Sequence, residues 1–376
     1  MTKIHELAQL GQSLWLDYIR RSFITDGKLQ ALLDNGLRGM TSNPSIFEKA
    51  IAHSDDYDQE IERLAGEGKS IEEIYTCLAV EDIQRAADML LPVYEETHRG
   101  DGYVSMEVNP DLAHKTQETI SEARRLWSLV DRPNLMVKIP ATKQGLEAIT
   151  QSIAAGLNIN VTLIFSLERY AEVMAAYIAG LEIRLDDGHP IDHIASVASF
   201  FVSRVDTKVD KRLDAIIQKS GHHAKLAHSL KGQAAVANAK VAYGQFKEVF
   251  ERDPYSRGGK FKALEARGAR LQRPLWASTS TKNPAYSDIK YVQELIGKHT
   301  VNTLPQETLE HFLDHGSVKL TLEDDMNQAR FVLESLEDIG ISMEQVTQEL
   351  EDEGVAAFSQ SFNSLMQSIE AKRSKF

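Results

Sequence analysis

Short apolar runs alternate along the chain with longer stretches in which apolar residues recur at helical spacing. Runs of about four to eight apolar residues bounded by turn signals are typical of buried strands. The pattern therefore predicts eight strands, each followed by helix. They are expected at Ser13–Tyr18, Leu37–Ser42, Tyr103–Val108, Asn134–Ile139, Asn158–Ile164, His193–Val202, Pro274–Ser280 and Thr300–Leu304.

The intervening stretches carry helix start and stop signals. Asp26 is a candidate capping residue for a helix that ends at Asn35-Gly36, and Ser70-x-x-Glu73 is a capping box before a long apolar-periodic stretch. These and two further helices are predicted over 26–36, 71–96, 144–153 and 167–185. Alternating strands and helices imply a parallel sheet, and eight units in 376 residues favour a closed (β/α)8 barrel, or TIM barrel, over an open doubly wound sheet.

Beyond Pro305 the pattern predicts only helices, over 306–315, 321–339 and 342–371. The last two begin with capping boxes at Thr321-x-x-Asp324 and Ser342-x-x-Gln345. No repeat and no linker rich in proline or glycine divides the chain. We expect residues 1–376 to form a single barrel domain, with 306–376 as a helical extension packed on the barrel or over its mouth.

Composition narrows the functional classes. The chain is 42% hydrophobic and 26% charged, and 42 Lys and Arg against 55 Asp and Glu give a net charge of -13, which disfavours nucleic acid and anionic membranes as partners. Cys77 is the one cysteine, so an internal disulfide and a thiolate metal cluster are excluded. With no apolar signal core and no stretch approaching a membrane span, we expect a cytoplasmic protein.

Lys138 is the most informative residue, because it lies inside the apolar run Asn134-Leu135-Met136-Val137-Lys138-Ile139-Pro140. Burying an ammonium is costly, and a desolvated lysine readily becomes the neutral amine that attacks a carbonyl. Lys138 is thus a candidate for Schiff-base chemistry, and a strand-end lysine whose amine reaches the surface is the alternative.

Other polar residues fall at the same ends of the predicted strands, where barrels of this type carry their catalytic groups. They are Asp17, Thr41, Asn43, Glu107, Asn109, Asn160, Thr162 and Ser199. Each alone can be a helix cap or a turn residue, as Asn43 before Pro44 illustrates. A buried lysine among acids, amides and hydroxyls suits attack on a ketone followed by proton transfer. No strand end offers the paired histidines that a metal site would require, so no metal site is predicted.

Cations near the same ends suit an anionic substrate. Arg204 follows the sixth strand, Ser278 lies near the end of the seventh and Lys282 follows it, where such barrels commonly bind phosphate. Arg204 is expected to bind phosphate, and pairing with Asp206 or Asp210 is the alternative.

With these residues assembled, the chain closely resembles the transaldolase family, in its longer bacterial form, from Leu14 to Pro305. The resemblance rests on four motifs: Thr41-Ser42-Asn43-Pro44-Ser45-Ile46-Phe47, Val137-Lys138-Ile139-Pro140-Ala141-Thr142, Asn160-Val161-Thr162-Leu163-Ile164-Phe165-Ser166 and Ser199-Phe200-Phe201-Val202-Ser203-Arg204. It implies transfer of a dihydroxyacetone unit from sedoheptulose 7-phosphate to glyceraldehyde 3-phosphate, without metal or organic cofactor, in the non-oxidative pentose phosphate pathway.

The resemblance also implies roles for single residues. Lys138 forms the Schiff base, Asp17 takes the proton of the C4 hydroxyl, and Glu107 works with Thr162 through a water. The resemblance also implies that Asn43, Asn160 and Ser199 bind the hydroxyls of the dihydroxyacetone unit and that Arg204 binds the phosphate.

Two departures and two alternatives stay open at this stage. Shorter transaldolases have an arginine after the seventh strand where this chain offers Ser280 and Lys282, and the helices beyond Pro305 differ in length. Related fructose 6-phosphate aldolases, which release free dihydroxyacetone, have a tyrosine where this chain has Phe201, so Phe201 favours transfer. A non-catalytic barrel that binds sugar phosphates is the other alternative. The resemblance is compatible with a monomer or a homodimer.

Overall fold

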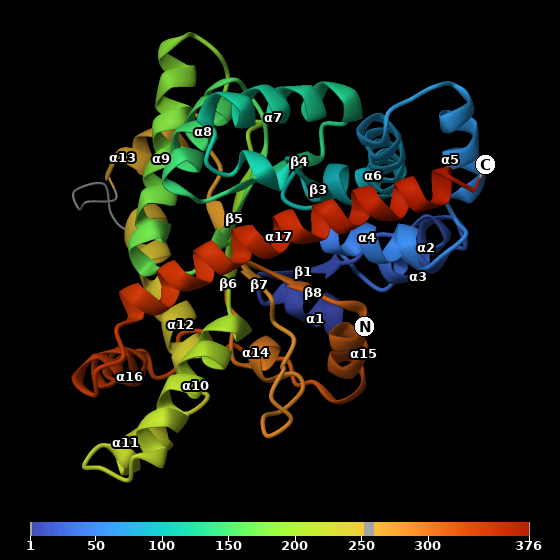
Figure 1. The fold of residues 1–376 in the computed structure, drawn as a ribbon. Coiled ribbons are helices and arrows are strands. Elements are labelled where there is room, and N and C mark those ends of the chain that lie inside the picture. Colours follow the sequence, from blue (N-terminus) through green and yellow to red (C-terminus); the bar gives the residue numbers. More distant parts are fainter. Residues whose placement is uncertain (1, 252–258, 376) are drawn as a thin grey trace.

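The computed structural model describes residues 2–251 and 259–375. Eight parallel strands close into a barrel in chain order, from β1 next to β2 around to β8 next to β1 (Figure 1). All eight predicted strands and the predicted (β/α)8 barrel are confirmed, with end shifts of a few residues. The strands are β1 Gln12–Asp17, β2 Gly39–Thr41, β3 Tyr103–Glu107, β4 Leu135–Pro140, β5 Ile159–Ile164, β6 Ser196–Phe201, β7 Gln272–Ala277 and β8 Thr300–Leu304.

Helices surround the barrel and fill its connections (Figure 1). Up to β6 they are α1 Lys3–Gln9, α2 Arg21–Thr25, α3 Lys28–Asp34, α4 Pro44–Ala52, α5 Asp58–Gly66, α6 Ile71–Glu96, the 3-10 turn η1 Pro110–Leu112, α7 Thr116–Val130, α8 Lys143–Ala154 and α9 Leu167–Asp186. After β6 they are α10 Ser203–Gln218, α11 Ala224–Leu230, α12 Ala234–Phe246, the π-helical turn η2 Lys247–Glu251, α13 Gly259–Glu265, α14 Lys290–Gln293, α15 Gln306–His315, α16 Met326–Asp338 and α17 Met343–Arg373.

The helix ends test the predicted caps. The capping box at Ser70 and Glu73 is present, and Ser342 caps α17 by accepting a hydrogen bond from the Gln345 amide. The predicted cap at Asp26 is wrong, since Asp26 is the C-cap of α2 and Gly27 is the N-cap of α3, with φ at 79°. Only two residues separate these helices, and glycine adopts the left-handed conformation that the tight turn requires.

The predicted capping box at Thr321 is also wrong. The Thr321 hydroxyl donates to the Gln293 carbonyl oxygen at 2.6 Å and accepts from the Ile296 amide at 3.2 Å. It therefore ties the chain to the segment after α14, and α16 starts later, at Met326. Here a tertiary contact takes the hydroxyl that the local pattern assigned to a cap.

The amino-terminal end of the barrel is filled by Trp15, which is fully buried. Its indole nitrogen donates to Asp101 at 3.3 Å, and Arg273 donates to the same carboxylate at 2.9 Å. Gly39 on the neighbouring strand lies in register with Trp15 and leaves room for the indole. This end is closed by packing and an ion pair, so a site in the barrel can open only at the carboxyl ends of the strands.

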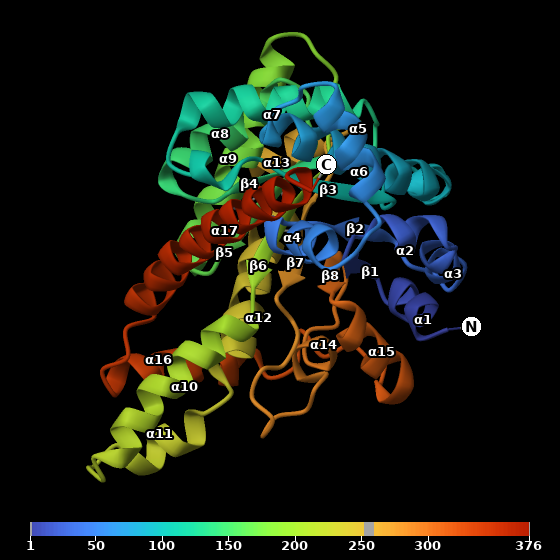
Figure 2. The same ribbon diagram turned by 45° about the vertical axis from the view of Figure 1, so that its right-hand side comes forward.

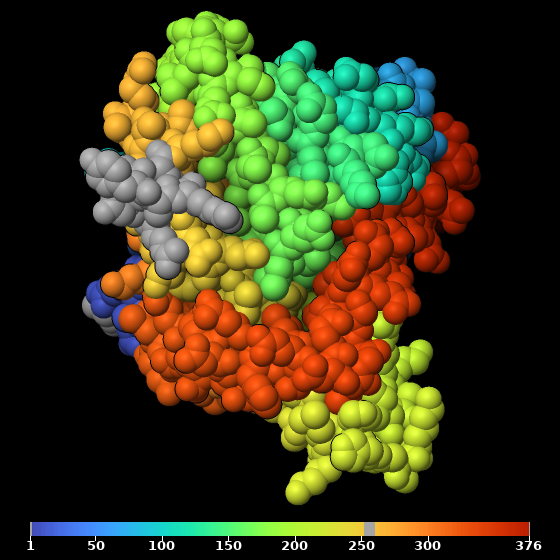
Figure 3. All heavy atoms as spheres, turned by 90° about the vertical axis from the view of Figure 1, so that its left-hand side faces the viewer, coloured from blue at the N-terminus to red at the C-terminus, as the bar shows by residue number. Residues whose placement is uncertain are grey.

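The last helix, α17, crosses those carboxyl ends, as two views of the molecule show (Figures 1 and 2). It packs on α4, η1 and α10, which follow β2, β3 and β6, and on β5 itself. Of the two positions that the sequence allowed for the terminal helices, α17 takes the one over the mouth. By contrast, α11 and the neighbouring part of α10 protrude from the body, as the space-filling view shows in yellow-green (Figure 3).

No helix among residues 2–251 and 259–375 is both long and apolar enough to cross a membrane.

Gly39 supplies a test of this packing. A Cβ at position 39 would lie 2.6 Å from the Trp15 ring, so we expect Gly39→Ala to lower the free energy of unfolding by about 1–3 kcal/mol. Gly66→Ala is the matched control, because nothing lies within 4 Å of a Cβ there and alanine favours the helix. Chemical denaturation monitored by tryptophan fluorescence measures both, and equal midpoints for the two variants would contradict the packing argument.

Candidate active site

The Lys138 side chain is buried at the carboxyl end of β4, with 5% of the residue exposed. Its amine donates to the Ser42 carbonyl oxygen at 3.1 Å and lies 3.4 Å from Oε2 of Glu107. The strand register pairs Lys138 with Glu107 on one side and with Asn160 on the other, so the three side chains share the inner face of the barrel. The alternative, a lysine that reaches the surface, is excluded.

Glu107 is buried and incompletely satisfied. Burial raises the pKa of its carboxyl above the usual 4.5, and the Lys138 amine offsets part of that increase. Within the described residues neither carboxylate oxygen has a hydrogen bond, apart from the ion pair with Lys138, and the buried Thr162 hydroxyl on β5 also lacks a partner. Unpaired buried polar atoms are costly, which indicates groups kept available for a substrate or a water.

Asp17, at the end of β1, is held by a pair of hydroxyls. The Thr41 hydroxyl donates to Oδ1 of Asp17 at 2.6 Å and lies 2.7 Å from the Thr303 hydroxyl. Burial raises the pKa of Asp17, whereas Lys138 and the Thr41 hydrogen bond lower it. Thr303 was missed from the sequence, because its position within β8 looks like an ordinary β-branched strand residue.

Asn160 bridges the barrel interior. Its side-chain oxygen accepts from the Ser199 hydroxyl at 2.7 Å, and its side-chain nitrogen donates to the Ser105 hydroxyl at 3.0 Å. The two predicted residues Asn160 and Ser199 are therefore in direct contact. Ser105 was also missed, although its position two residues before Glu107 places it on the same face of β3.

β5 is irregular next to Thr162. The register between β5 and β6 shifts between Val161 and Ile164, and Leu163 has a φ of 59°. A positive φ is uncommon for a bulky residue, and bulges recur beside active sites, where they redirect side chains. No local signal predicts this feature.

Asn43 and Phe201 border the same region. The side-chain oxygen of Asn43 caps α4 by accepting from the Ile46 amide at 3.0 Å, so this residue does act as a helix cap, and its side-chain nitrogen is left to donate elsewhere. Phe201, at the end of β6, is 6% exposed, and the guanidinium carbon of Arg204 lies 5.3 Å from its ring centre.

Arg204 lies at the beginning of α10, half-buried. Burial lowers the pKa of its guanidinium below the usual value, and the carboxylate of Glu353 on α17 offsets part of the decrease. No hydrogen bond or ion pair within the part of the chain that the structure describes engages it. The predicted alternative partners are otherwise occupied: Asp206 accepts from Ala235 and Tyr291, and Asp210 accepts from Gly232 and Tyr286. Arg204 is thus a cation without a protein counterion in contact.

Ser278 and Lys282 differ in their positions. Ser278, directly after β7, has a φ of 54°, and its hydroxyl lies 3.1 Å from that of Ser203 at the start of α10. Lys282 is exposed, and its amine donates to the Ser280 hydroxyl at 2.7 Å. It lines a separate pocket alongside three carboxylates of α10, from Asp206, Asp210 and Asp214. The structure brings Ser278 to Ser203, the residue before Arg204, but does not bring Lys282 into contact with the residues around Lys138.

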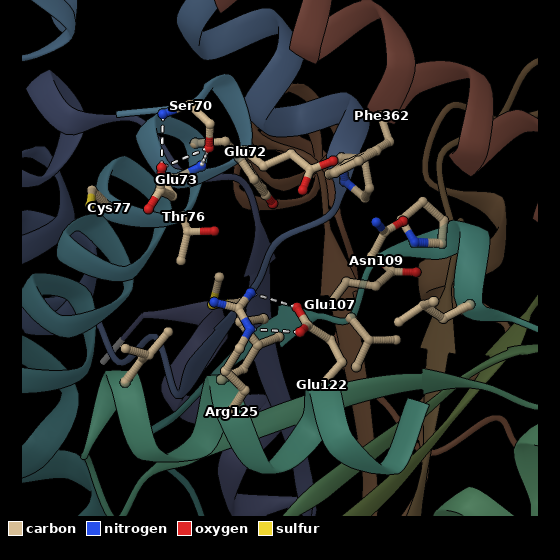
Figure 4. Close-up of a pocket in the computed structure, with 18 of the residues that line it drawn as sticks. Ser70, Glu72, Glu73, Thr76, Cys77, Glu107, Asn109, Glu122, Arg125 and Phe362 are labelled. Atoms are coloured by element: carbon tan, nitrogen blue, oxygen red, sulfur yellow. Dashed lines mark hydrogen bonds and ion pairs between the residues drawn. The ribbon is translucent and has the colours of Figure 1, made fainter. Parts of the chain in front are cut away.

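A pocket of about 400 Å³ lies beside the site, between α6, α7 and the end of β3 (Figure 4). Glu107 and Asn109 border it, and of its two cations, Lys69 and Arg125, the second makes two hydrogen bonds to Glu122 at 2.7 and 2.8 Å. Because that guanidinium is already paired, Arg125 offers less to an anion than Arg204 does. The described residues contain no group of three or more His, Cys, Asp or Glu side chains placed to hold a metal ion.

The sequence also gave no indication of Phe358. This residue of α17 is 5% exposed, and its ring centre lies 6.0 Å from the Lys138 amine. Nothing distinguishes it locally from other apolar positions of the helix, since its meeting with Lys138 depends on where α17 crosses the barrel.

The chain is similar in sequence to known proteins over nearly its whole length. The chain matches the family model described as Transaldolase/Fructose-6-phosphate aldolase over residues 14–369, a span that extends past Pro305 and includes most of α17. A protein named transaldolase from Trichodesmium erythraeum is 48% identical over 376 residues, covering 98% of this chain and 97% of the relative. A transaldolase of Mycobacterium tuberculosis is 46% identical over 367 residues, covering 97% and 95%. A protein named transaldolase 2 from Nostoc sp. is 48% identical over 373 residues, covering 98% and 96%.

The raised pKa of Glu107 leads to a prediction about stability. Between the usual 4.5 and its raised pKa, the folded chain binds a proton that the unfolded chain does not, so this group favours folding at low pH and ceases to do so as pH rises through the folded pKa. We expect Glu107→Gln to raise the free energy of unfolding at neutral pH, within the roughly 0.5–3 kcal/mol of single substitutions.

The increase in the free energy of unfolding caused by Glu107→Gln should become smaller as the pH falls towards 4.5. Urea denaturation of both proteins across this pH range measures the difference. A gain that is constant with pH, or a loss at neutral pH, would contradict the assignment of a buried carboxyl that ionises at a cost.

Proposed function

The chain belongs to the transaldolase/fructose-6-phosphate aldolase family, and on that basis we propose that its barrel acts as a transaldolase in which Lys138 forms the Schiff base. The reaction transfers a dihydroxyacetone unit from sedoheptulose 7-phosphate to glyceraldehyde 3-phosphate in the non-oxidative pentose phosphate pathway. The products are erythrose 4-phosphate and fructose 6-phosphate. One observation carries the assignment of the lysine: a buried amine 3.4 Å from a buried carboxylate at the carboxyl end of a barrel strand.

The first steps form the imine. Neutral Lys138 attacks the C2 carbonyl of the donor, and the carbinolamine then loses water to give a protonated imine. Each step moves a proton, and Glu107 is suited to give and take it, because its pKa is raised by burial. The unpaired hydroxyl of Thr162 supports the proposal of a water held between the two residues.

Asp17 serves the carbon–carbon cleavage. It removes the proton of the C4 hydroxyl as the C3–C4 bond breaks, the bond electrons move towards the protonated imine, and an enamine remains on Lys138 while the aldehyde leaves. The raised pKa of Asp17 favours proton uptake, and the Thr41 hydrogen bond fixes the carboxylate. Addition to the acceptor aldehyde reverses these steps.

The remaining residues bind substrate. We assign Asn43, Asn160 and Ser199 to the hydroxyls of the dihydroxyacetone unit. The pairing of Asn160 with Ser199 supports this, as does the side-chain nitrogen that Asn43 leaves for other acceptors. Such groups orient the three-carbon unit for both half-reactions.

The phosphate is assigned to Arg204, with Ser278 next to it. Arg204 lacks a counterion in contact and stands at the start of a 16-residue helix, where the helix dipole favours an anion. The approach of Ser278 to Ser203 adds a hydroxyl at this position. Lys282 is exposed in a neighbouring pocket, so we assign it a weaker, long-range contribution.

Phe201 bears on the choice between transfer and simple aldol cleavage. Its buried ring packs against Phe165 at 5.2 Å and offers no hydroxyl to a water or a free ketone. This supports transfer over release of dihydroxyacetone. A catalytically silent barrel is disfavoured, because a binding protein has no use for the cost of burying Lys138 beside Glu107.

We also propose that residues 306–376 belong to the same domain as the barrel, because α17 packs on helices that follow three different strands. A reducing cytoplasm fits the single, unpaired Cys77. The high negative charge fits a protein that does not bind nucleic acid, and a monomer or a homodimer is the expected assembly.

Borohydride reduction tests the Schiff base. We expect borohydride in the presence of fructose 6-phosphate to add a reduced three-carbon unit to the peptide that contains Lys138, because the imine is trapped as a stable secondary amine. Peptide mass spectrometry locates the adduct, and Lys138→Met is the control that should lose both adduct and turnover. An adduct on another lysine, or none, would refute the mechanism.

Arg204 and Lys282 offer a matched test of phosphate binding. We expect Arg204→Ala to raise KM for both phosphorylated substrates by roughly 10–100-fold, since a charge-assisted contact to phosphate is lost, with a smaller change in kcat. Lys282→Ala should change KM by less than about threefold, as expected for an exposed cation. Steady-state kinetics in a coupled assay measure both, and a larger effect at Lys282 would reverse the assignment.

A further inference from the structure

The helix α17 is fastened at both ends of its path across the barrel. Near its start, Glu349 accepts from Arg212 at 2.8 Å and pairs with Lys208 at 2.9 Å, both from α10. At its far end, the Lys372 amine donates to the Ser54 carbonyl oxygen at 2.7 Å and pairs with Asp58. The residues between these anchors are therefore held at fixed places over the mouth.

The middle of α17 approaches the strands closely. A Cβ at Gly354 would lie 3.0 Å from the Leu163 side chain, on the irregular end of β5, so only glycine allows this approach without a shift. Phe358 follows one helical turn later on the same face. Further on, the Ser361 hydroxyl accepts from the Ser45 hydroxyl of α4 at 2.6 Å.

Phe358 consequently faces the Lys138 amine. The Ser42 carbonyl oxygen, the Glu107 carboxylate and the Phe358 ring surround the nitrogen at 3.1, 3.4 and 6.0 Å, the last measured to the ring centre. The ring centre is farther than the roughly 4 Å of direct apolar contact. The 6.0 Å between the nitrogen and the ring centre therefore leaves distance for a carbon bonded to the nitrogen.

We propose that Phe358 is a positioning residue that keeps water from the carbon–nitrogen bond formed on Lys138, so that the three-carbon unit waits for an aldehyde and is not released. The inference rests on the proposed Schiff base. In this proposal the ring that shields the carbon–nitrogen bond comes from α17 and not from a strand of the barrel.

The competing reaction is simple hydrolysis. The enamine takes a proton at its carbon to become the imine, water adds to C2, and the carbon–nitrogen bond breaks, so that free dihydroxyacetone and the Lys138 amine result. It needs only water and a proton, and no electrons are exchanged with another reactant. An apolar ring over the bond lowers the local concentration of water and slows this step.

Release of the three-carbon unit tests the proposal. Fructose 6-phosphate is supplied without an acceptor to measure free dihydroxyacetone, and with erythrose 4-phosphate to measure sedoheptulose 7-phosphate. In Phe358→Ala we expect the ratio of release to transfer to rise by at least about tenfold, a barrier change of about 1.4 kcal/mol. Phe358→Leu keeps an apolar side chain without a ring, and its ratio should rise by less.

Phe362→Ala is the control. Phe362 lies one turn further along α17, is buried to the same degree, and packs edge-on against Tyr75 at 5.5 Å, with no recorded contact to Lys138. Its loss should reduce stability as much as the loss of Phe358 and leave the ratio unchanged. Thermal midpoints of both variants verify that they are folded and comparably destabilised.

The outcomes are distinct. An unchanged ratio in Phe358→Ala, or in Phe358→Leu if the alanine variant does not fold, overturns the proposal. An equal rise in Phe362→Ala also overturns it, since general loosening of α17 then suffices. Failure of borohydride to label Lys138 in the unaltered protein is a different result, because it refutes the Schiff base and not the role of the helix.

Discussion

The ion pair of Lys138 with Glu107 is the interaction on which the rest of the site depends. Removing two opposite charges from water is expensive, and their mutual attraction offsets the cost only in part, as the raised pKa of Glu107 shows. Such a pair persists only where a rigid framework holds both groups. Here adjacent strands in register hold them, with β3 carrying the acid and β4 the amine.

The two ends of the barrel carry different polar groups. The amino-terminal end is filled by the Trp15 indole and the Asp101–Arg273 ion pair, in which polar groups are paired. The carboxyl-terminal end keeps unpaired oxygens at Glu107 and Thr162. Buried oxygens without a partner also lie at the amino-terminal end, at Gln12, Asn134 and Gln272, but within the described residues only those of Glu107 and Thr162 lie at the carboxyl ends of the strands, where such barrels carry their catalytic groups.

Electrostatics within the site assign different tasks to similar groups. Glu107 and Asp17 both have pKa values raised by burial, yet among residues 2–251 and 259–375 Asp17 is held by a hydroxyl whereas Glu107 has no hydrogen bond apart from its pairing with the amine. A fixed carboxylate suits removal of one particular proton, and a freer one suits repeated exchange with water. The two acids therefore fit the two kinds of proton transfer that a Schiff-base aldol reaction requires.

The sequence by itself determined the strands, the closed barrel and most of the site, since strand periodicity places Lys138, Glu107, Asn160 and Ser199 on one inner face and parallel topology brings the strand ends together. It could not determine contacts made between distant segments. Local pattern assigned the Thr321 hydroxyl to a cap, but α14 and the residues after it take that hydroxyl. Thr303 near Asp17, the bulge at Leu163 and the ring of Phe358 over Lys138 were decided only by tertiary packing. Side-chain periodicity is a local property of the backbone, whereas the path of α17 over the mouth depends on anchors contributed by helices far away in the chain.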